Sequence, residues 1–162
     1  MMAPSGAGKT TLLRILAGLE KADSGQIEGL EGLRISMVFQ EDRLCENLSA
    51  SANIRLVRGK KPWGRDKKLE AKISKAMAAV GLGGCEDQPV REFSGGMRQR
   101  TALLRALYSE WDVLFLDEPF KGLDEETKEL VIEYTKKQCF GKTVIFVTHD
   151  RSEAGKMGGR LF

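Results

Sequence analysis

The stretch from Ala3 to Thr11, APSGAGKTT, has the residue types and the spacing of a loop that binds phosphate. Its two glycines would allow backbone N–H groups to approach an anion, and the helix expected to follow would add its positive N-terminal end. Lys9 is long enough to reach the terminal phosphates of a nucleotide, and the Thr10 hydroxyl is a ligand type for Mg²⁺. The pattern G-x-x-x-x-G-K-[ST] begins with glycine, whereas this sequence has Ala3. Because the other positions of the pattern fit and a helix is expected to follow directly, we predict phosphate binding rather than an ordinary glycine-rich turn.

Two carboxylates follow an apolar run in the stretch VLFLDE, residues 113–118. An apolar run without polar alternation is typical of a strand buried in a parallel sheet. Ligands bind at the carboxyl ends of such strands, so Asp117 would hold Mg²⁺ and Glu118 would accept a proton from an attacking water. By itself the pattern fits a strand and an acidic turn equally well. The phosphate-binding loop in the same chain favours the functional interpretation.

A histidine and a pair of glycines are further candidates. His149, the only histidine, follows the apolar stretch 143–148. A lone histidine is more often structural, but the end of a second strand of the same sheet would bring this one beside the γ-phosphate. Ser94, Gly95 and Gly96 would open a helix and so make a second anion-binding helix start. One nucleotide does not need two such sites in one subunit, so the second would face a nucleotide of another subunit. A plain helix cap is the alternative.

The elements that must position these residues alternate between strand and helix at both ends of the chain. Apolar spacing and capping residues predict helices over 9–19, 49–57, 66–80, 94–108 and 124–139, and from 150 onward. Strands are expected over 34–39, 112–118 and 142–148, with a short strand between turns in 22–32. This order predicts an α/β fold with a parallel sheet, and the all-helical stretch of about 48–108 predicts a helical insertion.

Composition sets outer limits on the function. The 162 residues have the length of one domain, and a hydrophobic content of 41% is enough for a core. The longest apolar runs are far shorter than the ~20 residues needed to cross a bilayer. Cys45, Cys85 and Cys139 are odd in number and widely spaced, which argues against a disulfide framework or a zinc site and for a reducing cytoplasm. A net charge of +3 does not by itself indicate nucleic-acid binding, and no nucleic-acid partner is expected.

The motifs follow one another in a fixed order: the phosphate-binding loop, Gln40 after a strand, the SGG helix, the strand ending in Asp-Glu, KGLD and VTHD. In this order they resemble the motifs of the ATP-binding cassette family. The resemblance covers Ala3 to about Phe162. It implies a P-loop NTPase (RecA-like) fold with a parallel sheet core, and binding of ATP and Mg²⁺. By this resemblance the nucleotide would be held by the loop and by the signature motif of the opposite subunit, that is by Ser5, Gly6, Ala7, Gly8, Lys9, Thr10 and Thr11, and by Ser94, Gly95 and Gly96.

The resemblance also assigns the metal and the hydrolysis step. Mg²⁺ would be held by Thr10, Gln40 and Asp117. Glu118 would activate water, with assistance from His149 and Gln40. Two subunits would close head to tail around two nucleotides, and Gln40 would couple the site to a transmembrane permease. The chain would then lie in the cytoplasm, peripheral on the inner face of the membrane.

Three segments narrow the resemblance further. VFQEDRL, SGGMRQR and DEPFKGLD look most like the ATPases of bacterial importers for nitrate, sulfonate, taurine and similar small solutes. The leading hypothesis is therefore an ATPase subunit that energises such an importer. The signature helix also carries Arg98, Arg100 and Arg105, which could add positive potential toward the nucleotide or could face solvent.

Departures from the family pattern keep two alternatives open. Family members have a strand that enters the loop and an upstream aromatic residue that stacks on adenine, whereas this sequence begins at Met1. We therefore expect an incomplete single domain over 1–162, without the first strand and most of the antiparallel subdomain. One alternative is a truncated nucleotide-binding fragment without turnover. The other is a non-transport cassette ATPase of DNA repair or translation, although no coiled-coil insertion or tandem cassette is visible in the sequence.

Overall fold

A computed structural model describes residues 8–58 and 66–159 of the protein. The strands are β1 (Ile35–Val38), β2 (Val113–Asp117) and β3 (Thr143–Val147). The helices are α1 (Lys9–Leu16), α2 (Ala50–Arg55), α3 (Lys67–Ala79), the 3-10 helix η1 (Val90–Glu92), α4 (Gly95–Tyr108), α5 (Glu125–Cys139) and α6 (Arg151–Met157). Each helix predicted from capping residues and apolar spacing is present, with ends shifted by a few residues. Within the described residues, no helix is long and apolar enough to span a membrane.

The described strands form one parallel sheet in the order β1-β2-β3. All five residues of β2 are buried, as expected for a central strand without polar alternation. The pairing aligns Val38 with Leu116 and Asp117 with Val147, so the three carboxyl ends lie along one edge of the sheet. The predicted α/β class with a parallel sheet is confirmed, and the ends that carry the candidate residues are neighbours.

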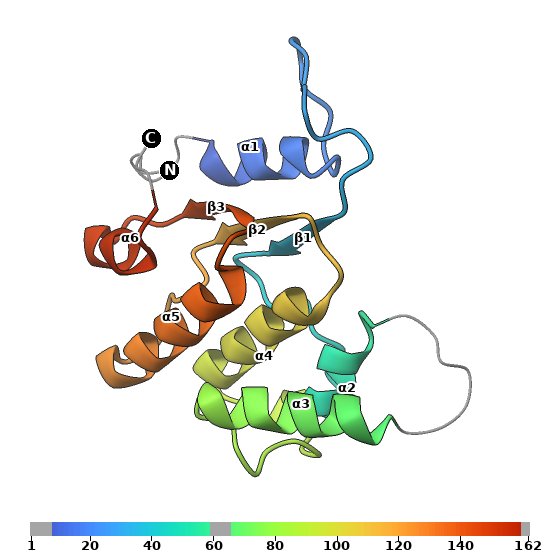
Figure 1. Ribbon diagram of the computed structural model, residues 1–162, viewed down its shortest axis with the longest axis vertical. Helices are drawn as coiled ribbons and strands as arrows, with labels where there is room; N and C mark the ends of the chain where they lie inside the picture. Colours follow the sequence, from blue (N-terminus) through green and yellow to red (C-terminus); the bar gives the residue numbers. More distant parts are fainter. Residues whose placement is uncertain (1–7, 59–65, 160–162) are drawn as a thin grey trace.

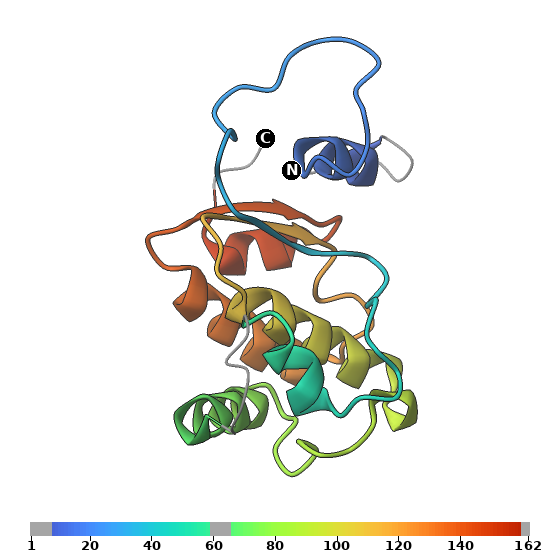
Figure 2. The same cartoon turned by 90° about the vertical axis from the view of Figure 1, so that its right-hand side faces the viewer.

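Helices cover the two faces of the sheet unequally (Figure 1). On one face α1 packs over β2, where Leu13, Phe115 and Val147 form a small buried cluster. The larger core lies on the other face, under α4 and α5, and includes Leu103, Leu116 and Phe120. The helices α2 and α3 lie beyond α4 (Figures 1 and 2), and the regular elements described within the region 48–108 are all helices. Its helix α4 also packs on β1, since Ser36 Oγ donates a 3.0 Å hydrogen bond to the carbonyl of Ala106.

The prediction of a short strand within 22–32 is wrong. The segment between α1 and β1 has no strand and arches away from the sheet in Figure 2. Gly25, Gly29 and Gly32 all have positive φ there, at 99°, 81° and 73°, which is outside the extended region that a strand requires. The glycines were interpreted as turns on either side of a strand, but a strand needs a neighbour to pair with, and the arch has none among the described residues.

Candidate active site

The first candidate pair joins α1 to the end of β2. The Thr10 hydroxyl donates a 2.7 Å hydrogen bond to Oδ2 of Asp117, whose side chain is buried and whose residue is 2% exposed. A hydroxyl and a carboxylate are both oxygen ligands of the kind that Mg²⁺ prefers. These two residues are 107 positions apart in the sequence, so their contact is made by the fold. Their chemistry and their position fit a magnesium ion.

The N-terminal end of α1 has no side-chain cap among the described residues. The helix begins after Gly8, which has φ 75°, and it has neither a side-chain cap nor an acidic residue in its first turn. Among the described α-helices, every other one is capped by a side-chain oxygen, from Ser49, Asp66, Ser94, Asp124 or Asp150. The first-turn N–H groups of an uncapped helix lack intrahelical partners, and the helix dipole favours a negative ligand there. This end of α1 therefore fits a phosphate group.

Glu118 follows β2 in a backbone conformation that is rare for a residue other than glycine, with φ 48°. Such a conformation costs about 1–3 kcal/mol and persists only where the surroundings enforce it. Here the N–H of Glu118 donates to the carbonyl of Val147 at 2.9 Å. The side-chain amide of Gln99 donates to the carbonyls of Glu118 at 3.4 Å and Pro119 at 3.2 Å. The strained turn is thus held from both β3 and α4.

The carboxylate of Glu118 meets the histidine predicted to work with it. Its Oε1 lies 3.0 Å from Nδ1 of His149, and its Oε2 lies 3.8 Å from Nζ of Lys121. The Glu118 side chain is 19% exposed and that of His149 is 68% exposed. A partly buried carboxylate next to an imidazole with an accessible face can take a proton from a water that the imidazole orients.

His149 is held in place by a buried network that the sequence interpretation did not include. The hydroxyl of Thr148 donates to Oε2 of Glu153 at 2.6 Å and accepts from the N–H of Asp150 at 3.0 Å. Glu153 is itself buried, and Nζ of Lys128 lies 3.7 Å from its other oxygen. This network fixes the residues on both sides of His149 and so aims the imidazole toward Glu118.

Gln40 lies exposed just after β1 and borders two pockets. One, of about 370 Å³, is also lined by Thr10 and Lys121. The other, of about 520 Å³, is also lined by Gly95 and Gly96. Gln40 therefore lies between the Thr10 side of the site and the signature glycines. Of the other predicted binding residues, Thr11 lies exposed in α1, and Ser5, Gly6 and Ala7 lie outside the described residues.

The signature turn, residues Ser94 to Gly96, lies close to the segment that follows β2. The hydroxyl of Ser94 accepts a 3.3 Å hydrogen bond from the N–H of Met97 and so caps α4. A Cβ placed on Gly96 would lie 3.3 Å from Cδ2 of Leu123, which is tighter than most real contacts, whereas a Cβ on Gly95 would meet nothing within 4 Å. The two glycines are therefore not equivalent, although both were predicted as binding residues.

We expect Gly96→Ala to lower the free energy of unfolding by about 1 kcal/mol relative to Gly95→Ala, because the added methyl presses on the half-buried side chain of Leu123. The measurement is urea denaturation of both variants beside the parent chain. Gly95→Ala is the matched control, because it adds the same methyl group to the same helix where there is space. Equal unfolding midpoints for the two variants would contradict the expectation.

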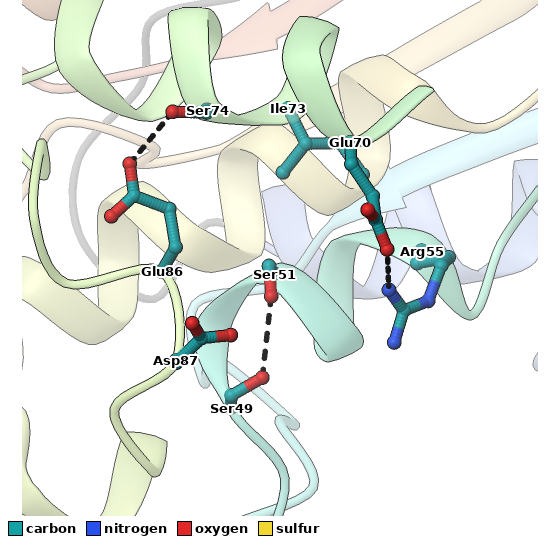
Figure 3. Close-up of a pocket in the computed structure, with 8 residues that line it drawn as sticks. All are labelled: Ser49, Ser51, Arg55, Glu70, Ile73, Ser74, Glu86 and Asp87. Carbon is teal, nitrogen blue, oxygen red and sulfur yellow. Dashed lines mark hydrogen bonds and ion pairs between the residues drawn. The ribbon is translucent and has the colours of Figure 1, made fainter. Parts of the chain in front are cut away.

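A further pocket, of about 260 Å³, lies in the helical layer (Figure 3). Arg55 pairs with Glu70 at 3.3 Å on one side, and Ser74 donates to Glu86 at 2.9 Å on the other. The remaining lining residues are Ser49, Ser51, Ile73 and Asp87. None of the residues predicted for nucleotide or metal lines this pocket, so it is separate from the candidate site.

Comparisons with known proteins agree on one family. The model of the ABC transporter family matches residues 1–121. The sulfate/thiosulfate import ATP-binding protein CysA of Xanthomonas campestris is 39% identical over 99% of this chain and 51% of its own length. The thiamine import ATP-binding protein ThiQ of Chelativorans is 40% identical over 99% of this chain and 70% of its own length.

A solved structure is similar as well. It is the dimeric post-hydrolysis state of the ATP-binding cassette MJ0796 bound to ADP and Pi, with a TM-score of 0.80 and 28% identity over 96% of this chain and 75% of that one. The chain spans about half the length of the CysA relatives that it matches. With the family profile, the relatives and this fold in agreement, the chain belongs to the ABC transporter family, as a P-loop cassette of the α/β class.

Proposed function

We propose that the chain is the ATP-binding and ATP-hydrolysing part of a subunit that energises import of a small solute. The observation that carries the proposal is the contact of Thr10 with Asp117 at the uncapped end of α1. The similarity to import ATP-binding proteins for sulfate or thiosulfate, thiamine and Fe(3+) supports import as the process. We retain the narrower group of nitrate, sulfonate and taurine importers as a proposal from the three sequence segments.

Each part of the site has a proposed role. Bound Mg²⁺ would supply charge neutralisation between the phosphate oxygens, and Thr10, Gln40 and Asp117 would hold it. Lys9 and the first-turn N–H groups of α1 would bind the phosphates, together with the loop residues before them. Glu118 would accept the proton of the attacking water, and His149 would orient that water.

The proposal includes partners and a location. A second subunit would meet this one head to tail, so that Ser94, Gly95 and Gly96 of each face the nucleotide of the other. A transmembrane permease would contact the region around Gln40, and the chain would lie in the cytoplasm on the inner face of the membrane. We also propose that 1–162 belong to one cassette domain with a helical subdomain at about 48–108.

The test is phosphate release from Mg-ATP as a function of chain concentration. If each site is completed by the signature turn of a partner, the specific activity is expected to rise with chain concentration and then to level off. A specific activity that is independent of concentration would contradict the head-to-tail arrangement. No phosphate release from a chain that Mg-ATP stabilises would overturn hydrolysis and favour the alternative below.

The second candidate function is a nucleotide-binding fragment without turnover. The observation that favours it is the position of β3 at an edge of the described sheet, where Val144, Ile145 and Phe146 are only half buried. A sheet edge with unpaired backbone groups is less rigid than a paired one. Since β3 leads directly to His149, a loose β3 would weaken the contact with Glu118 while leaving the binding residues of α1 in place.

A further inference from the structure

The loop formed by residues 41–48, which follows Gln40, is bound by the guanidinium group of Arg98 in the signature helix α4. Nε of Arg98 donates to Oδ2 of Asp42 at 2.7 Å, and its Nη2 donates to Oδ1 of the same carboxylate at 3.1 Å. The same guanidinium also reaches Glu46 at 3.3 Å and the carbonyl of Val90 at 3.3 Å. The two side chains of the pair are 20% and 22% exposed. Two parallel, partly buried bonds between guanidinium and carboxylate are both stronger and more directional than a single contact.

A second arginine of α4 holds the backbone of the same loop. Arg105 donates to the carbonyls of Asp42 at 2.9 Å and Arg43 at 2.8 Å. Arg43 has φ 48°, a left-handed conformation that is unfavourable for its residue type, and its guanidinium lies 4.0 Å from the ring centroid of Phe39. The two bonds from Arg105 fall directly on this strained turn and stabilise it.

The far end of the loop is held from α2. Asn53 is fully buried, and its Oδ1 accepts from the N–H of Cys45 at 2.9 Å while its Nδ2 donates to the carbonyl of Cys45 at 3.1 Å. Gln40 and Glu41, by contrast, are exposed and make no side-chain hydrogen bond within the part of the chain that the structure describes. The backbone of the loop is therefore fixed to the helices from Asp42 onward, two residues after Gln40, while the side chain of Gln40 is left exposed.

We propose that the Arg98–Asp42 pair makes the loop and α4 one rigid unit, so that any displacement of the signature turn at Ser94–Gly96 carries Gln40 with it. Arg98 is then a positioning residue that acts on Gln40 through Asp42. Only the consequence for Gln40 rests on the proposed hydrolysis of ATP. The fastening of the loop follows from contacts that are independent of nucleotide.

Amide hydrogen exchange of the full chain without nucleotide tests the fastening. In Arg98→Lys and in Asp42→Asn we expect the amides of Leu44 and Cys45 to exchange at least about tenfold faster, because a lysine or an amide cannot reproduce the two parallel bonds. The charge-reversed double variant, Asp42→Arg with Arg98→Asp, is expected to restore part of the protection. Arg55→Lys is the matched control, since it changes the same residue type in the Arg55–Glu70 pair of the helical layer. Unchanged exchange in both single variants overturns the proposal.

Exchange with Mg-ATP present, together with kinetics, tests the effect on Gln40. In the parent chain Mg-ATP is expected to change exchange at 41–46 and at 94–98 together, and in Arg98→Lys the change at 41–46 is lost. We expect turnover of Arg98→Lys to fall about tenfold while KM for ATP stays within about twofold, because Lys9 and Thr10 are untouched. Faster loop exchange with unchanged turnover and an unchanged response to Mg-ATP overturns the positioning role. If Mg-ATP does not bind to the parent chain, the proposed function fails, and the nucleotide-free exchange still decides the fastening.

Discussion

A chain that carries Glu118→Gln is expected to bind Mg-ATP as the parent does and to release phosphate at least about a hundredfold more slowly. The amide has almost the same shape as the carboxylate but cannot accept a proton from water. The strained turn should persist, because it depends on the backbone contacts of Glu118 with Val147 and on the Gln99 amide, and the substitution removes none of these. Phosphate release and the thermal shift with Mg-ATP are the two measurements.

A matched control separates this role from a general loss of negative charge. Glu126→Gln removes an exposed carboxylate from the first turn of α5, and turnover is expected to stay within about twofold of the parent value. Unaltered turnover in Glu118→Gln would mean that another group accepts the proton. Lost turnover together with a lost thermal shift would instead point to a binding role for Glu118.

The parts of the fold predicted correctly from sequence are those with local causes. Capping by Ser49, Asp66, Ser94 and Asp124 depends on residues two or three positions away, so the helix starts could be predicted within a residue or two. The uniform burial of β2 likewise follows from its own apolar run. The proximity of Glu118 to His149 followed from one additional rule, that parallel strands end at a common edge, and that of Thr10 to Asp117 from the assignment of both residues to one Mg²⁺.

Contacts between distant residues could not be predicted from local patterns. For Arg98, Arg100 and Arg105 the sequence left a choice between the nucleotide and solvent, and in the structure all three bind groups of the chain itself. Arg100 donates to the carbonyls of Val80 at 2.8 Å and Gly81 at 3.0 Å. The long side chain of an arginine can bind any backbone carbonyl oxygen that lies near it in space. Spacing in the sequence therefore does not reveal the partner.

Two buried polar residues show what signal was overlooked. Gln99 lies on the same side of α4 as the buried Ala102 and Leu103, three and four positions later, and Glu153 is next to the buried Ala154. A polar side chain on an apolar helix face must find a partner, because an unsatisfied buried group costs ~1–3 kcal/mol. This reasoning identifies such residues as anchors, although it cannot name the strand ends that they hold.

Lys9→Ala is expected to abolish the stabilisation by Mg-ATP. A ligand present at about 100 times its dissociation constant, and binding only the native state, adds ~2.7 kcal/mol to the free energy of unfolding. For a chain of this size that raises the melting temperature by roughly 5–10 °C. Lys9 is the first residue of α1 and precedes Thr10, whose hydroxyl contacts Asp117. Removing its ammonium group takes away positive charge where the phosphates would lie and leaves the Thr10–Asp117 contact intact.

The control and the parent chain decide what a lost shift means. Lys21→Ala removes an exposed lysine from the arch between α1 and β1, and the Mg-ATP shift should persist there. A shift that disappears in Lys9→Ala but not in Lys21→Ala assigns nucleotide binding to the N-terminal end of α1. If the parent chain unfolds cooperatively and its melting temperature is the same with and without Mg-ATP, the proposed nucleotide site is contradicted. A shift that survives in Lys9→Ala places the bound phosphates elsewhere, because an uncapped helix end without its lysine is a far weaker anion site.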